Sequence, residues 1–196
     1  MIIASSAGGG LLLWQQADDP EPEKGPAARI PAGECRGTLD DPRFSDLLQS
    51  ASPPSVRTES APLIRTAPAS LSCVVTGSNQ RSLVATLQGA ATEAERTRNE
   101  GQQVPRDFVA FPDGEAGDRF SVVRFSCVTK LTPDSPDHIW YYTAALSLQS
   151  PDGPAVPAPG PQRMTDLTVA LARQAAGKAL ACTNTLQLPN GPYTFR

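Results

Sequence analysis

The stretch His138–Gln149, HIWYYTAALSLQ, has the clearest structural pattern in the chain. Apolar and polar side chains alternate along it, so one set would share a face of an extended strand and the other set would share the opposite face. A strand with this pattern buries its apolar face and turns its polar face outward. We therefore predict a β-strand here. The residues that we predict on its apolar face are Trp140, Tyr142, Ala144, Leu146 and Leu148.

Several other segments also have the features of strands. Leu71–Thr76 and Ser82–Gln88 are rich in Val, Leu and Thr and are separated by a Gly-Ser-Asn turn, which is typical of paired strands. Arg119–Leu131 alternates as clearly as His138–Gln149 does, with Val123, Phe125 and Cys127 on one face. Shorter strands are expected at 108–111 and 185–188, and 193–195 could pair back after the Asn-Gly turn.

Thr165–Cys182 is predicted to be the longest helix, because its apolar residues recur at helical spacing and Cys182 falls on their side. A short helix is expected from Asp41-Pro42 to about residue 50, with Asp41 as its N-cap and Pro42 in its first turn. Residues 90–101 favour an exposed helix. The fold class is therefore α+β, an antiparallel sheet with one long C-terminal helix packed across it.

Segments rich in proline, glycine and acidic residues are predicted to be irregular. Residues 51–69 carry four prolines and are predicted to be largely irregular. We also predict a turn at Asp113–Asp118 and a loop at Pro151–Gln162.

The four cysteines, Cys35, Cys73, Cys127 and Cys182, are far apart and form no CxxC motif. That spacing argues against a zinc site and a thioredoxin-type redox site, whereas two disulfides fit an exported chain. Three pairings are possible. We favour Cys35–Cys73 and Cys127–Cys182, because each pair links neighbouring elements; buried free thiols are the alternative.

The chain divides into three parts by composition. Residues 1–14 are apolar and uncharged, whereas residues 15–34 are acidic and rich in proline, as a disordered tether would be. Residues 35–196 have the composition of a folded domain. The tether carries the whole formal charge of −3, so the domain offers no basic surface for nucleic acid.

The apolar segment at residues 1–14 is too short to cross a bilayer as a helix, and no segment elsewhere is long and apolar enough. It also lacks the basic residues with which a signal peptide begins. We interpret it as a partial membrane anchor or signal remnant whose beginning lies upstream of Met1. An apolar N-terminus on a cytosolic protein is the alternative.

Residues that could carry catalysis are few. The single histidine, His138, would have to serve any Ser–His–Asp or Cys–His site. The adjacent carboxyls of Asp40 and Asp41 are better explained by helix capping, and the acidic residues of 113–118 lack the spacing of a calcium loop. Tyr141 lies on the face opposite Trp140. No cofactor or metal site is expected.

The segments CRGTLDDPRF, Cys35–Phe44, and SCVVTG, Ser72–Gly77, carry a resemblance. With the apolar and acidic segments before them, they resemble uncharacterised membrane-anchored or secreted proteins of actinobacteria with a four-cysteine extracytoplasmic domain. The chain is also similar to extracytoplasmic sensor domains of actinobacterial Ser/Thr kinases, which carry two disulfides. The likeness covers Cys35 to Arg196 and supplies no binding residues; the residues before Cys35 do not form a lipidation signal.

These observations lead us to expect a non-enzymatic, membrane-anchored binding or sensor module outside the cytoplasm, or a secreted one. Its partner would be a protein or a component of the cell envelope. A cell-envelope hydrolase with a scattered site that includes His138, or a structural subunit of an envelope or secretion complex, is the alternative function.

Overall fold

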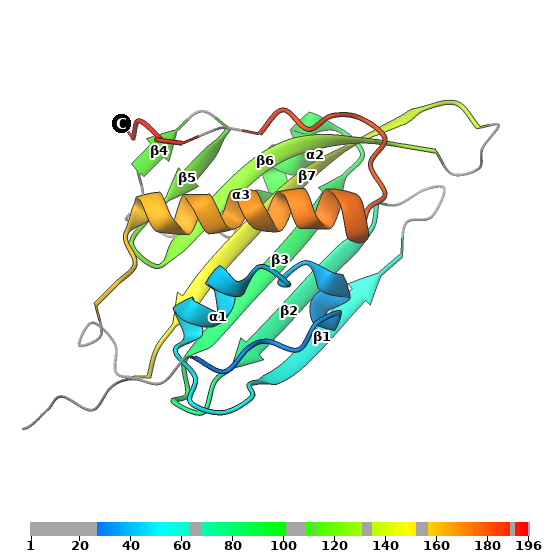
Figure 1. Cartoon of the computed structure of the whole chain (residues 1–196). Helices are drawn as coiled ribbons and strands as arrows, with labels where there is room; N and C mark the ends of the chain where they lie inside the picture. Colours follow the sequence, from blue (N-terminus) through cyan, green and yellow to red (C-terminus); the bar gives the residue numbers. More distant parts are fainter. Residues whose placement is uncertain are drawn as a thin grey trace, which may run out of the picture.

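The computed structural model describes residues 27–62, 68–100, 109–111, 113–130, 135–151, 157–188 and 191–195. They form a seven-stranded antiparallel sheet in the order β1-β2-β3-β7-β6-β5-β4, with the long helix α3 across one face (Figure 1). The predicted α+β class and the predicted C-terminal helix are confirmed. The strands are β1 Ser55–Ala61, β2 Ser70–Thr76, β3 Ser82–Ala90, β4 Val109–Phe111, β5 Gly114–Ala116, β6 Phe120–Thr129 and β7 His138–Gln149; the helices are η1 Glu34–Gly37, α1 Pro42–Leu48, α2 Glu93–Glu100 and α3 Pro161–Lys178.

The stretch that decided the expected fold, β7, lies at the centre of the sheet between β3 and β6. The five residues predicted on its apolar face are all buried. Helix α3 packs on the same face and contributes Met164, Leu167 and Leu171 to the core. Burial of large apolar side chains between one sheet face and one helix is the main stabilising contribution in such a layered fold.

Both favoured disulfides are present. The Cα atoms of Cys35 and Cys73 are 5.7 Å apart, and those of Cys127 and Cys182 are 5.2 Å apart, both within the range for a disulfide. The first bond holds the η1 turn against β2, and the second ties β6 to the chain that leaves α3. Neither strand-borne cysteine is accessible, since Cys73 and Cys127 are fully buried.

The expected bounds of the long helix were wrong at both ends. Helix α3 begins at Pro161, inside the predicted loop, because proline is well suited to the first helical turn. It ends at Lys178, so Cys182 lies beyond the helix rather than on its apolar side. The chain after α3 instead runs along β6, where the Thr183 N–H donates to the Val128 carbonyl at 2.8 Å.

Three further corrections concern strands. Residues 51–69 contain β1, an edge strand whose side chains are mostly exposed, so it shows no apolar alternation. Residues 113–118 contain β5, which pairs with β4 through a tight turn at Asp113, where φ is 62°. Thr185–Leu188 is not a strand in the structure. Whether each of these three segments forms a strand depends on its pairing with a neighbouring strand. The local sequence does not encode that pairing.

The expected apolar anchor and most of the acidic tether fall in residues 1–26, outside the described residues. The last part of the expected tether includes Ile30, which is buried in the core. Its N–H donates to the Ser45 hydroxyl at 2.9 Å, which fixes the chain against α1. Within the described ranges, no helix has the length and apolar character that a transmembrane span needs.

Candidate binding surface

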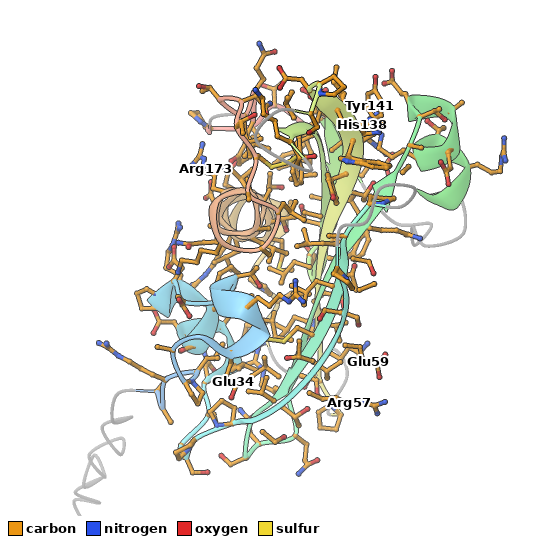
Figure 2. The ribbon with its side chains drawn as sticks, turned by 90° about the vertical axis from the view of Figure 1, so that its right-hand side faces the viewer. Glu34, Arg57, Glu59, His138, Tyr141 and Arg173 are labelled. Atoms are coloured by element: carbon orange, nitrogen blue, oxygen red, sulfur yellow. A yellow bond between two sulfur atoms is a disulfide. The ribbon has the colours of Figure 1, made fainter. Side chains whose placement is uncertain are left out.

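The two faces of the sheet differ in what covers them. Helices α1 and α3 lie over one face, whereas α2 lies on the other (Figures 1 and 2). Helix α2 packs mainly against β3 and β7, so much of this second face is not covered by a described helix. We call it the open face. On β2 and β3 it carries a polar, hydroxyl-rich set of side chains, namely Ser70, Ser72, Thr76, Ser82, Thr86 and Gln88, interrupted by Val74 and Val84.

A hollow of about 400 Å³ lies over β1, β2 and β3. Its lining residues include the polar Glu59, Ser72, Thr86 and Gln88. Hydroxyl and amide groups both donate and accept hydrogen bonds, so this lining suits a neutral polar ligand. The volume is in the range of small-ligand sites, but the lining is more polar than most such sites have.

Strand β1 forms one edge of the sheet, and it borders this hollow. Six of its seven residues are exposed. Arg57 and Glu59 project from it on the same side of the sheet as α2 (Figure 2) and form an ion pair of 2.6 Å. Among the described residues no strand pairs with the outer edge of β1, and such an edge is where an added strand can pair.

Helix α2 is attached to the opposite part of the open face. The guanidinium carbon of Arg96 lies 5.8 Å from the centre of the Tyr141 ring, a cation–π distance. Arg96 also pairs with Glu93 at 3.0 Å, so the helix holds its own arginine over the ring. The prediction that Tyr141 faces away from Trp140 and Tyr142 is therefore confirmed.

His138 is the first residue of β7, and its ring centre lies 4.2 Å from that of Trp140. Its side chain is exposed. No hydrogen bond joins it to a hydroxyl or a carboxylate among the residues that the structure describes, so it is not part of an assembled catalytic triad there.

The carboxyls of Asp40 and Asp41 serve the fold. Asp41 accepts from the Arg43 N–H at 3.0 Å as the N-cap of α1, as predicted. Asp40 pairs with Lys178 at 2.6 Å. Hydrogen bonds from Lys178 to Asp40 and from Arg43 to Asp41 lower the pKa of each carboxyl. The two are therefore fixed in separate interactions and do not form an acid–base pair.

The acidic residues of 113–118 do not gather into one site. Glu115 pairs with Arg124 of β6 at 2.9 Å, whereas Asp113 and Asp118 are exposed. Among the described residues, no group of three or more His, Cys, Asp or Glu side chains could hold a metal ion. All four cysteines are in disulfides, so none offers a free thiol.

Sequence reasoning missed the hollow on the open face. The signal was present, because the residues of β2 and β3 that alternate with the buried ones are mostly Ser, Thr and Gln. That pattern is also typical of an ordinary solvent-facing strand, and only the sheet order places these residues beside an uncovered edge. The chain matches no family model, no curated protein and no solved structure.

Proposed function

We propose that the chain is a non-enzymatic binding module of the cell envelope, exposed outside the cytoplasm, that holds an extended polypeptide segment of a partner protein. The observation that carries this proposal is the asymmetry of the sheet. One face is sealed by α1 and α3, whereas the other has a polar hollow beside the uncovered edge strand β1.

An extended polypeptide fits these features better than a compact ligand. Edge strands recruit such segments through backbone hydrogen bonds, and pockets beside the edge accept alternate side chains. Arg57 and Glu59 neutralise each other on β1, so the edge does not select a strongly charged partner. The hydroxyl groups of Ser72 and Thr86 in the hollow would satisfy polar groups of the bound segment.

The extracytoplasmic location is supported by the two disulfides, because disulfides persist in oxidising compartments. The membrane attachment that we propose depends on residues 1–14, which lie outside the described residues.

Site-specific photo-crosslinking in the native host tests the proposal. A photoreactive side chain at Ser72, in the hollow, should give a defined adduct with one polypeptide. The matched control is Ser126 of β6, which is exposed on the same face of the sheet but away from the hollow. Glu59→Lys should reduce the Ser72 adduct, because a cation would then replace the carboxylate beside it.

Identical products from Ser72 and Ser126, or a Ser72 adduct that contains only lipid or glycan, would contradict the proposal.

The variant His138→Ala distinguishes the proposed binding module from a hydrolase that uses His138. β2 and β3 lie between β1 and the β7 strand that carries His138, so the variant should keep the full yield of the Ser72 adduct. A host phenotype that requires His138 but not the hollow would favour the hydrolase instead.

A further inference from the structure

A second hollow lies at the opposite end of β2 and β3, beside α1 and the start of α3. Its volume is about 260 Å³, and it is lined by Gln49 at the end of α1, Arg81 before β3, and Arg163 in the first turn of α3. None of these residues borders the hollow on the open face. The two hollows are therefore separate, and a ligand of the second one does not depend on the proposed function.

Arg81 is the unusual residue of this hollow, because it is a cation that is only 5% exposed. One terminal nitrogen donates to the Gln49 side-chain oxygen at 2.8 Å, and the Nε atom is buried without an acceptor in the described structure. No described carboxylate forms an ion pair with it. Burial and the positive charge of Arg119 both lower the pKa of Arg81. A buried cation with only a neutral amide partner is costly.

The first turn of α3 adds a second source of positive potential. This helix has 18 residues, and Gly160 at its N-cap provides no side-chain acceptor. The first turn contains no acidic residue, whereas Arg163 adds a cation to it. The first N–H groups of a helix have no partner within the helix and attract anions. Buried Arg81 and exposed Arg163, which belongs to the first turn of α3, thus line one hollow.

One negative group opposes them. Asp46 of α1 also lines the hollow, and it is exposed. Its carboxylate forms no ion pair with Arg81 or Arg163 among the described contacts, so it does not neutralise either one. Because its negative charge lies beside the hollow, it should weaken the binding of an anion, so its removal provides a test with an effect opposite to that of removing an arginine.

We propose that this hollow binds a small oxyanion, a phosphate or carboxylate group, with the Arg81 guanidinium as its principal hydrogen-bond donor. A guanidinium suits such groups because its N–H donors match two oxygens at once. The bound oxyanion supplies the negative charge that no described carboxylate supplies to Arg81, and it is reached by the terminal nitrogens of the guanidinium rather than by the buried Nε atom. Arg163 strengthens binding through its charge from the edge of the hollow.

The test is an NMR titration of the oxidised full chain at low ionic strength, in which the Arg81 Nε–H signal is followed. Inorganic phosphate and acetate are added separately, with sodium chloride as the ionic-strength control. A saturable shift with phosphate alone assigns the phosphate chemistry, and one with acetate alone assigns the carboxylate chemistry. Sodium chloride should not reproduce either shift.

Variants then locate the site. Arg81→Gln removes the Nε–H signal itself, so its binding is followed through the backbone amide signals of Gln49 and Arg163, which line the hollow. Its dissociation constant should rise about tenfold, because a charge-assisted hydrogen bond is lost. Arg163→Gln should raise the dissociation constant about threefold, and Asp46→Asn should lower it about threefold, as expected for exposed charges. Arg57→Gln, on the exposed edge strand far from this hollow, should leave it unchanged.

Two results would overturn the assignment. One is a shift that rises linearly with every salt, chloride included. The other is a saturable shift that Arg57→Gln weakens as much as Arg163→Gln does. If Arg81→Gln does not fold, the opposite effects of Arg163→Gln and Asp46→Asn still decide between binding and its absence, because both residues are exposed.

Discussion

Lys178 at the end of α3 reaches Asp40, which lies just before α1, with its Nζ atom 2.6 Å from the carboxylate. The same ammonium donates to the Gly37 carbonyl at 3.2 Å, and Asp40 in turn accepts from the Gly33 N–H at 3.0 Å. The pair thus joins the first and the last helical parts of the described chain. It also fastens the η1 turn, which carries Cys35, against the end of α3.

Asp40→Asn should destabilise the fold by about 0.5–1 kcal/mol at neutral pH, the range of a favourable but partly exposed ion pair. Hydrogen bonding from Lys178 lowers the pKa of Asp40 below its usual 3.8 in the folded state. Its contribution is therefore present above pH 3.8 and is lost as the pH falls through the lower folded-state value.

Urea denaturation at neutral pH and at successively lower pH measures this effect. The matched control is Glu59→Gln, which breaks the highly exposed Arg57–Glu59 pair and should change stability very little. An Asp40→Asn variant with unchanged stability at every pH would contradict the role assigned to the pair.

The two disulfides should each be worth about 4 kcal/mol by the loop-entropy relation, since they close loops of 38 and 55 residues. Replacement of Cys127 and Cys182 together by alanine should therefore lower the free energy of unfolding strongly, as should the same change at Cys35 and Cys73. Denaturation of each double variant measures the loss. Peptide mapping without reductant checks the pairing, and any bond between the two pairs would contradict it.

The sequence predicted the central part of the fold well, because burial there follows strand and helix periodicity. β7 and β6 alternate cleanly, and the core face of α3 repeats at helical spacing. Asp41-Pro42 marked the start of α1 because capping is a local property. The cysteine pairing followed from the order of neighbouring elements.

The edges of the fold and both hollows were not predictable in the same way. β1 has no apolar face to detect, and it is ordered by pairing with β2. Arg81 follows a turn and looks like a solvent-exposed residue in the sequence, yet α1 covers it through Gln49. These features arise where segments that are distant in the sequence contact each other. The periodicity of apolar residues within one segment does not indicate such contacts.

Leu171→Ala should cost about 2–5 kcal/mol, because this side chain is fully buried between α3 and the sheet and its loss leaves a cavity. Ile139→Ala is the control, since Ile139 is 50% exposed on the opposite face of β7. Thermal or chemical unfolding of the two variants measures the difference. Equal losses would contradict the assignment of the two faces of the sheet.

Replacement of both Arg57 and Glu59 by valine should make the protein associate through the β1 edge. These charged side chains stand on a strand whose outer backbone groups are unpaired among the described residues, and charges on such edges oppose pairing between copies. Stability of the monomer should change by less than about 0.5 kcal/mol, because both residues are exposed. Analytical ultracentrifugation should detect dimers or larger species in this variant.

The control is Ser126→Val, which adds a valine at an exposed position on the interior strand β6 and should stay monomeric. If both variants associate alike, added hydrophobicity rather than the open edge is responsible.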